Sequence, residues 1–404
     1  MNKLPEEITL HILNYLENTV DVINFSLTCK HNRNLVINNS KRFNCVSTFN
    51  NKYINQISRF DIIGKIKIKI SNSKMTNLNI FKNIDSTNII DLDLSYCKKL
   101  FNISMLFNFN KVTIKSCDAI KDISALRNIK ILNLIECDGI KDISSLTNVK
   151  ELNLTHCYLI NDVSSLRYVS KLNLMGCYKI TDVSMLGKVK KLNLSYCDNI
   201  TDVSMLGDIQ NLNLKDCTSI TDVSMLGKVK KLNLSGCYNI TDVSMLGDVK
   251  YLYLKSCWQI KDVSMLGNII NLDLSYCYGI EDVSNLGNVI KLNLSNNHKI
   301  TDVSNLGNVK KLNLTKCINI TDFSNLGNVI DLNLSFCKGL NNVNNLGKIK
   351  KLNISGCNRI IDVSTLTNVE DLNLSHCGNI RDVSMLRKVK KLNISFCKKI
   401  IKSI

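Results

Sequence analysis

From Asp91 to the end of the chain, apolar positions recur with a period of twenty residues, without insertion or deletion. The period gives fifteen complete repeats and a shortened one that begins at Lys391. Counting Asp91 as position 1, every complete repeat has aliphatic residues at positions 2, 4, 10, 13, 16 and 19, with Phe109 and Phe323 as the only aromatic substitutes. A fixed period of this size predicts a solenoid, in which each repeat buries its apolar residues only against its neighbours.

Two local patterns within a repeat predict two short elements. The segment KLNLS at residues 191–195 alternates polar and apolar side chains, which predicts a strand with one buried face. Its leucines would point inward, and its polar residues, Lys191, Asn193 and Ser195, would point outward. The segment TDVSMLG at residues 201–207 is too short for an α-helix and ends in Gly, so it predicts a single 3₁₀ turn. The predicted fold class is an α/β solenoid.

A short polar residue stands at position 12, near the start of each predicted turn. It is Asp in thirteen of the fifteen complete repeats, as at Asp202, two residues before Ser204. A short polar side chain here is a good acceptor for the free backbone N–H groups of a turn. The alternative is a calcium site, but such a loop needs several oxygen ligands of its own. The sequence therefore predicts turn capping and no metal.

The repeat resembles a known family. The segment VKKLNLSYCDNI at residues 189–200 is similar to the leucine-rich repeat, L-x-x-L-x-L-x-x-N/C-x-L, with one extra residue before the last aliphatic. Position 7 is Cys in all repeats but one, where Asn297 provides the other residue that the pattern accepts. The resemblance implies a horseshoe with a parallel concave β-sheet and short 3₁₀ or turn segments on the convex side.

The regular repeats define the domain organisation. We expect residues 91–404 to form the leucine-rich-repeat solenoid and residues 1–45 to form a separate helical module. Between them, residues 46–90 would be a linker and a degenerate first repeat, because residues 66–90 keep a strand-like alternation but lose the period and the Cys.

The first 45 residues follow a helical period instead of a twenty-residue one. Pro5 stands at the opening of the first helix, where its missing N–H costs nothing, and Glu6 suits the positive end of the helix dipole. The apolar residues and the proline that open this helix are Leu4, Pro5, Ile8, Ile12, Leu13 and Leu16.

This module resembles an F-box in the order of its residues. The segment LPEEITLHILNYLENTVDVINFSLTCKHNRNLV at residues 4–36 carries the Leu-Pro opening, the Ile-Leu-x-x-Leu step and the Ser-Leu-x-Cys-Lys stretch, with Asn32 where the family usually has Trp. The resemblance implies an all-α bundle whose residues Leu4, Pro5, Ile8, Ile12, Leu13 and Leu16 contact the Skp adaptor of a cullin-RING ubiquitin ligase. The repeats would then hold a protein substrate.

An alternative stays open for the same residues. A bundle this small cannot bury all its apolar side chains alone, so it could simply cap the first coil of the solenoid. The protein would then be a binding scaffold without a ligase. Binding to the adaptor separates the two hypotheses.

The number and spacing of the cysteines indicate whether the protein belongs to a reducing or an oxidising compartment. Of seventeen Cys, fifteen occupy position 7, and only Cys29 and Cys45 lie elsewhere. Stacked repeats place these thiols side by side about 4.8 Å apart, pointing inward, and no Cys-x-x-Cys pair exists for zinc. We therefore expect free, buried thiols in a reducing intracellular compartment, and no metal or other cofactor. Glu6 and Glu7 interrupt any signal-peptide core, and no apolar run is long enough to span a bilayer.

The formal net charge of +18 raises the possibility of nucleic-acid binding. The excess comes mainly from Lys in a chain rich in Asn and Ile, which is typical of AT-rich coding bias, so nucleic acid is the weakest of three alternatives. The composition and regular duplication resemble repeat families of protists and of large DNA viruses of amoebae. We expect a cytoplasmic protein, in the host cytoplasm if it is viral, with the nucleus as an alternative.

Outward aromatic residues predict a partner site in the middle of the solenoid. The segment YLYLKSCWQI at residues 251–260 contains the only Trp of the chain. The candidate residues are Tyr238, Tyr251, Tyr253, Lys255, Trp258, Tyr276 and Tyr278. Grouped aromatic side chains anchor protein interfaces, although Tyr also commonly covers the apolar base of a loop. Lys rows such as Lys190 and Lys191 would attract an acidic partner or simply be solvated.

Catalysis has no support in the sequence. The five His are dispersed and no Cys/His or Ser/His pair recurs with the repeat. There is no phosphate loop of the GxxxxGK type. We therefore expect a non-enzymatic protein that works through its partners.

Overall fold

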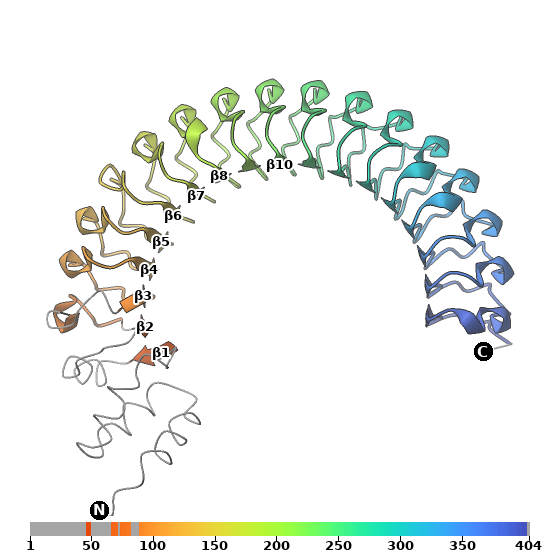
Figure 1. Cartoon of the computed structure of the whole chain (residues 1–404), viewed down its shortest axis with the longest axis horizontal. Helices are drawn as coiled ribbons and strands as arrows, with labels where there is room; N and C mark the ends of the chain where they lie inside the picture. The colour runs from red at the N-terminus through yellow and green to blue at the C-terminus, as the bar shows by residue number, and fades with distance from the viewer. Residues whose placement is uncertain (1–45, 50–65, 72, 82–88, 402–404) are drawn as a thin grey trace, which may run out of the picture. The chain divides into compact units, whose positions relative to one another are not determined.

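The structure, a computed structural model, describes residues 46–49, 66–71, 73–81 and 89–401. The chain forms two compact units, unit 1 (Met1–Asn193) and unit 2 (Leu194–Ile404), each of which is described by itself. Within each unit the strands gather along one side of the ribbon, called here the strand side, and the 3₁₀ helices along the other, the turn side (Figure 1). The prediction of a solenoid of parallel strands and single 3₁₀ turns is confirmed.

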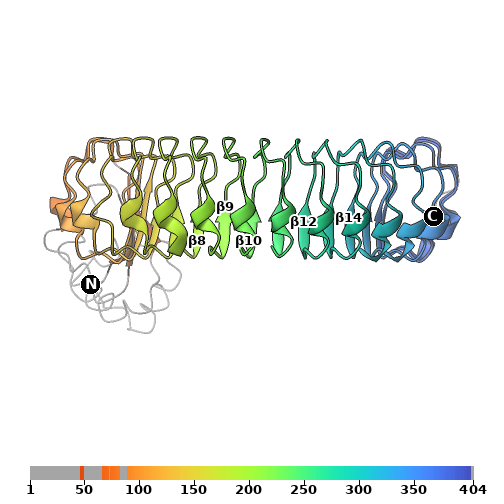
Figure 2. The ribbon, with the colours of Figure 1, turned by 90° about the horizontal axis from the view of Figure 1, so that it is seen from above.

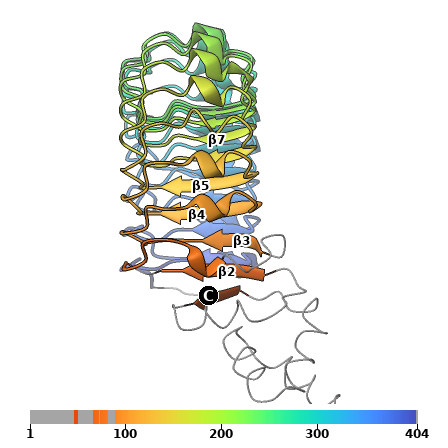
Figure 3. The ribbon, with the colours of Figure 1, turned by 90° about the vertical axis from the view of Figure 1, so that its left-hand side faces the viewer.

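Unit 1 begins its sheet before the first regular repeat, because β1 pairs in parallel with β2 and β2 with β3. Its lower strands lie one above another in Figure 3. Its strands are β1 (Val46–Phe49), β2 (Ile66–Ile70), β3 (Ile89–Asp93), β4 (Lys111–Lys115), β5 (Ile131–Ile135), β6 (Glu151–Asn153), β7 (Lys171–Asn173) and β8 (Lys191–Asn193). Its 3₁₀ helices are η2 (Asn79–Phe81), η4 (Ser104–Leu106), η5 (Ser124–Leu126), η6 (Ser164–Leu166) and η7 (Ser184–Lys188).

Unit 2 repeats one strand and one turn throughout, and Figure 2 shows its turns in a row. Its strands are β9 (Asn211–Asn213), β10 (Lys231–Asn233), β11 (Tyr251–Tyr253), β12 (Asn271–Asp273), β13 (Lys291–Asn293), β14 (Lys311–Asn313), β15 (Asp331–Asn333), β16 (Lys351–Asn353), β17 (Asp371–Asn373) and β18 (Lys391–Asn393). Its 3₁₀ helices are η8 (Ser204–Leu206), η9 (Ser224–Leu226), η10 (Ser244–Leu246), η11 (Ser264–Leu266), η12 (Ser284–Leu286), η13 (Ser304–Asn308), η14 (Ser324–Asn328), η15 (Asn344–Leu346), η16 (Ser364–Leu366) and η17 (Ser384–Lys388).

The register of unit 2 places equal positions of consecutive repeats side by side. Leu232 in β10 pairs with Leu212 on one side and Leu252 on the other, each one full period away. This register follows from the period itself, because any other offset would bring a polar position into the core. Side chains at one position therefore form a row that runs along the unit.

The predicted apolar positions form the core. In the repeat that starts at Asn211, the side chains of Leu214, Cys217, Ile220 and Leu226 have no exposed surface. Full burial of one such aliphatic side chain is worth roughly 1.5 to 3 kcal/mol, before ordering costs. Each repeat adds several of these side chains, and stability accumulates by stacking neighbours.

Most strands end after three residues because of the side chain at position 3. In β10, Asn233 Oδ1 accepts the backbone N–H of Ser235 at 3.0 Å, so the chain turns away from the sheet. The alternating pattern predicts that Asn193, at this position, points outward. The side chain at position 3 is instead half-buried and, in β10, bonded to the backbone, and Asn193 Nδ2 also donates to Asn173 Oδ1 at 2.9 Å.

The early end of the strand corrects one prediction. Ser195 was expected to point outward, but only 2% of its surface is exposed. The strict alternation stops at position 3, and the chain turns inward two residues later. The residue that follows, Tyr196, has a left-handed backbone with φ of 62°.

That left-handed residue recurs at position 6 in all sixteen repeats. Three of them are glycines, including Gly236 with φ of 79°, and thirteen are other residues. The left-handed conformation costs a non-glycine residue about 1 to 2 kcal/mol. A backbone hydrogen bond to the next repeat offsets this cost. The Tyr196 N–H, for example, donates to the Lys215 carbonyl oxygen at 2.8 Å.

Candidate protein-interaction site

Aromatic side chains of unit 2 form a row at position 8, just beyond the ends of the strands. The aromatic row consists of Tyr238, Trp258, Tyr278 and His298. The rings of Tyr238 and Trp258 stack with centroids 5.3 Å apart and planes 11° from parallel. Tyr278 and His298 stack in the same way at 6.1 Å and 9°. Half of the Trp258 surface is exposed, so the row presents ring edges and polar tips to solvent.

The strand side beside this row carries two more aromatic residues. Tyr251 and Tyr253 begin and end β11, and both are half-buried. Lys231 Nζ lies 5.6 Å from the centre of the Tyr253 ring, within cation–π range. Asn271 Nδ2 donates to Tyr253 Oη at 3.2 Å, which holds the phenol in place.

Tyr276 and Lys255 connect the strand side to the aromatic row. Lys255 Nζ lies 5.3 Å from the Tyr276 ring centre. Tyr276 in turn meets Tyr278 edge to face at 6.3 Å. The structure therefore brings Lys255, Tyr276 and Tyr278 into one connected group. Tyr251 stands at the opposite end of β11 from position 8 and does not belong to this group.

The sequence prediction missed His298. Its residue type did not attract attention, but its place in the repeat is a signal, because position 8 is the row that already contains Tyr238, Trp258 and Tyr278. Unit 1 has a shorter example of the same geometry, in which Tyr158 and Tyr178 stack at 5.6 Å with planes 5° from parallel. A candidate site in these repeats is therefore found by comparing the residues at one position of consecutive repeats, and not by considering single residues.

The strand side of unit 2 carries two lysines beside the aromatic residues, together with Asp273, the register partner of Tyr253. Lys231 and Lys255 contact aromatic rings rather than carboxylates. At the borders of this region the charges are paired, with Lys311 Nζ 2.8 Å from an oxygen of Asp331. Positive charge beside half-exposed aromatic rings suits a protein segment that carries acidic and apolar side chains.

The cysteine row has a structural role. Cys237 Sγ donates to the carbonyl oxygen of Leu214 at 3.0 Å, and equivalent contacts join the other repeats. Burial raises the pKa of Cys237 to about 12 and that of Cys137 to about 11, so these thiols stay protonated at neutral pH. The Cys that the structure describes are free and nearly all buried, as predicted, and are unsuited to nucleophilic chemistry.

The aspartates at position 12 cap the turns, as predicted. Asp202 Oδ1 accepts the N–H of Ser204 at 2.9 Å, and this bond lowers the pKa of the carboxyl group. Among the described residues, no group of three His, Cys, Asp or Glu side chains is placed to hold a metal ion. In the same part of the chain, no helix has the length and apolar character needed to cross a membrane.

The predicted adaptor-binding residues, Leu4, Pro5, Ile8, Ile12, Leu13 and Leu16, lie outside the residues that the structure describes. The geometry of the predicted F-box is therefore not part of the site described above.

The fold defines the class of protein as a leucine-rich-repeat solenoid. A structure of the TLR13–ssRNA13 complex is similar, with 19% identity and a TM-score of 0.50 over 86% of this chain and 55% of that chain. InlJ from Listeria monocytogenes aligns at 19% identity and a TM-score of 0.47, covering 80% of this chain and 70% of that one. Internalin InlF from Listeria monocytogenes aligns at 21% identity and a TM-score of 0.42, covering 76% of this chain and 88% of that one.

A family model described as F-box-like matches residues 1–42. The matched segment precedes the solenoid of regular, cysteine-containing repeats of twenty residues, so the chain combines an F-box-like match at its N-terminus with leucine-rich repeats. No curated protein matches the chain by sequence.

Proposed function

We propose that this protein is the substrate-recruiting subunit of a Skp/cullin/F-box ubiquitin ligase. The observation that carries the proposal is the order of its parts, an F-box-like domain at residues 1–42 followed by a long repeat surface. The F-box would bind the Skp adaptor, and the repeats would bind a target protein. The chain itself would be non-enzymatic, and the ubiquitin chemistry would belong to its partners inside the cell.

The proposed division of the chain follows the sequence. Residues 1–45 form the F-box module, residues 46–90 join it to the solenoid, and residues 91–404 form the regular repeats. The parallel pairing of β2 with β3 supports a degenerate first repeat within the joining segment.

The proposed adaptor contact rests on the apolar residues of the first helix that the sequence predicts. Leu4, Pro5, Ile8, Ile12, Leu13 and Leu16 are the residues that match the family pattern. Burial of one such aliphatic side chain is worth about 1.5 to 3 kcal/mol before ordering costs, so a few of them provide a specific interface.

The substrate site is proposed at the aromatic residues of unit 2. Trp258 offers the largest exposed ring of the row, and Tyr253, Lys255 and Tyr276 extend the surface onto the strand side. Aromatic anchors carry a large share of the binding energy at protein interfaces, and the flanking lysines favour an acidic target segment.

Calorimetric titration of the full chain against a purified Skp adaptor tests the ligase assignment. We expect saturable binding by the wild type and its loss in the double variant Leu4→Ala/Pro5→Ala, with circular dichroism showing an unchanged solenoid. The matched control, Tyr178→Ala in unit 1, should bind the adaptor normally. Absence of binding by the folded wild type would favour the alternative, a scaffold whose N-terminal helices only cap the repeats.

The substrate site is tested separately by Tyr253→Ala/Trp258→Ala. Targets that co-purify with the wild-type ligase complex should be lost, because the variant removes two aromatic side chains from the proposed surface. Tyr178→Ala is again the control, since it truncates a stacked ring at the same position of unit 1. Equal recovery of targets by the double variant, measured by quantitative mass spectrometry, would place the substrate site elsewhere.

A further inference from the structure

The turn side of unit 2 carries an exposed row of methionines. The methionine row consists of Met205, Met225, Met245 and Met265, at position 15 of four consecutive repeats. Each side chain is 60 to 62% exposed. The following repeats have Asn at this position, as at Asn285, so the turn itself does not require an apolar residue. Contiguous exposed apolar side chains of this kind mark interaction surfaces, and flexible thioethers adapt well to a partner.

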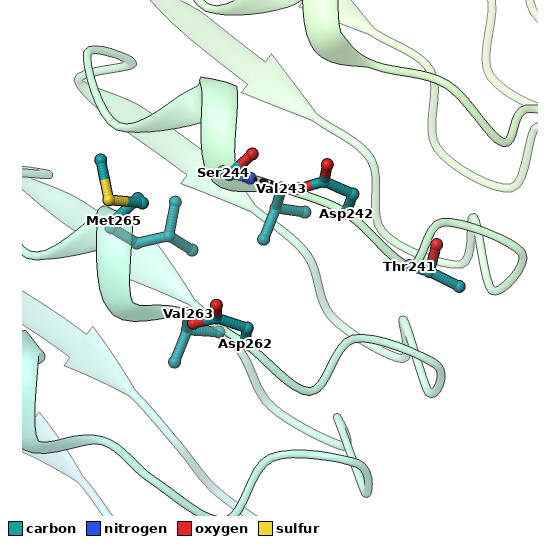
Figure 4. A pocket seen from close by; sticks show the side chains of 8 residues that line it. Thr241, Asp242, Val243, Ser244, Asp262, Val263 and Met265 are labelled. Atoms are coloured by element: carbon teal, nitrogen blue, oxygen red, sulfur yellow. Dashed lines mark hydrogen bonds between the residues drawn. The ribbon is translucent and has the colours of Figure 1, made fainter.

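Shallow grooves separate consecutive turns beside these methionines. The groove between η10 and η11 has a volume of about 260 Å³ and is lined by Val243, Val263, Leu266 and Met265, with Asp242 and Asp262 at its rim (Figure 4). An equivalent groove of about 200 Å³ precedes it and one of about 290 Å³ follows it. The turn side therefore repeats the same apolar floor and acidic rim from one repeat to the next.

The acidic rim is made by Asp222, Asp242 and Asp262. One oxygen of each carboxylate accepts the N–H of the Ser two residues later, at 2.8 to 2.9 Å, which leaves the other oxygen available to a partner. The salt bridges among the described residues do not involve these three aspartates. A chain with a net charge of +18 thus keeps a row of aspartates without salt bridges beside its exposed methionines.

The pairing of apolar and acidic side chains indicates the occupant. Consecutive turns stay close, because a Cβ on Gly227 would lie 2.3 Å from the Met245 carbonyl oxygen. An amphipathic α-helix carries an apolar stripe along one face with charged residues beside it. A helix whose charged residues are basic would therefore place its apolar side chains on the methionines and its Lys or Arg side chains on the aspartates.

We propose that the turn side of unit 2, from Met205 to Met265, binds a basic amphipathic helix of a partner protein. Its apolar stripe lies on the methionines, and its Lys or Arg side chains reach Asp222, Asp242 and Asp262. This site is independent of the proposed adaptor and substrate contacts, because it lies on the side of unit 2 opposite the strands. A protein with two such surfaces binds two partners at once.

Two variants test the site without disturbing the fold, because the chain itself provides the replacements. Met225→Asn/Met245→Asn/Met265→Asn copies the residue found at Asn285 in the same position. Asp222→Asn/Asp242→Asn/Asp262→Asn keeps the turn cap, since Asn342 Oδ1 accepts the N–H of Asn344 at 2.8 Å in its own turn. The matched control is Met385→Asn, which removes an exposed methionine outside the row.

The probe is a fluorescent, helix-forming peptide of about 18 residues, with Leu on one face and Lys and Arg beside it. Fluorescence anisotropy with the full-length protein should show saturable binding that weakens with salt. Each triple variant should weaken the affinity for the peptide about tenfold or more. A tenfold loss of affinity corresponds to about 1.4 kcal/mol of binding free energy. The Met385→Asn control should bind like the wild type.

Three results would overturn the proposal. The first is no binding of the peptide to the folded wild type. The second is equal affinity for the wild type and both triple variants. The third is equal affinity for a peptide of the same composition whose sequence is shuffled so that it has no apolar face, because simple charge attraction would then suffice. None of these results bears on binding to the Skp adaptor.

Discussion

The strands of the early repeats differ in length from those of unit 2. β4 and β5 in unit 1 have five residues and pair along their full length, whereas β10 and its neighbours have three. At position 3, β4 has Thr113, and Asn133 in β5 turns its amide to donate to Thr113 Oγ1 at 3.0 Å. In β10 the Asn233 side chain instead accepts the Ser235 N–H. The shorter strand therefore goes together with a side-chain oxygen at position 3 that accepts a backbone N–H two residues later.

The two regions also differ on the turn side. Position 17 is Arg127 or another residue with a side chain in the early repeats, and Gly in most of unit 2. At Gly227 an added Cβ would lie 2.3 Å from the Met245 carbonyl oxygen, so the two turns touch through backbone atoms. Gly227 has φ of −59°, which any residue adopts, so close approach and not backbone conformation explains this glycine.

The largest expected effect comes from closing that space. Gly227→Ala should lower the free energy of unfolding by about 1 to 3 kcal/mol, as overpacking does, because a methyl group must push two turns apart. Without the contact the same change would stabilise the protein by roughly 0.4 to 1 kcal/mol, since Ala restricts the unfolded chain. Urea denaturation measures the free energy of unfolding of both proteins. A decrease in Gly227→Ala would show that the two turns touch, and an increase would show that they do not.

Arg127→Ala is the matched control for that substitution. It leaves Ala at the same position of a unit 1 repeat and should change the free energy of unfolding by no more than about 0.5 kcal/mol. A similar loss in both variants would mean that Ala is unfavourable at position 17 in general, and that turn spacing does not distinguish the two regions.

A smaller effect is expected at the one repeat that lacks the position 7 cysteine. Asn297 Nδ2 donates to Leu274 and Leu294 carbonyl oxygens at 2.8 and 3.0 Å, but its Oδ1 is buried without a hydrogen-bond partner. Asn297→Cys should raise the free energy of unfolding by about 1 to 2 kcal/mol, because a buried unsatisfied acceptor is removed. Thermal denaturation measures the change.

The reverse substitution, Cys237→Asn, completes the test. It introduces the same unsatisfied acceptor into a regular repeat and should lower the melting temperature. If both substitutions were neutral, a bound water or a small shift would satisfy the Asn oxygen, and the cysteine row would not be needed for hydrogen bonding.

Much of this fold could be predicted from the sequence because the period repeats one physical solution many times. The aliphatic positions, the cysteine row and the capping role of Asp202 all follow from burial and from acceptors near free N–H groups. The aromatic residues were also predicted. Their grouping required the register, which stacks Tyr238 on Trp258 and Tyr278 on His298.

The features that the sequence pattern did not predict depend on backbone geometry. The left-handed residue at position 6 is Gly in only three repeats, so residue type does not reveal it. The burial of Ser195 follows from that bend, which an alternating pattern cannot predict. The methionine row gave no signal as a site, because an apolar residue beside a buried Leu is compatible with the core until its exposure is known.

The smallest effect concerns the strand ends. In Asn233→Thr, position 3 copies Thr113 and no longer offers a carbonyl oxygen to the Ser235 N–H. We expect a loss of about 0.5 to 1.5 kcal/mol, the net worth of one hydrogen bond, and faster hydrogen exchange at Ser235 by NMR. The control Asn233→Asp keeps the acceptor, since Asp273 Oδ1 accepts the Ser275 N–H at 3.0 Å. Equal protection of Ser235 in both variants would mean that the sheet itself, and not the side chain, sets the length of these strands.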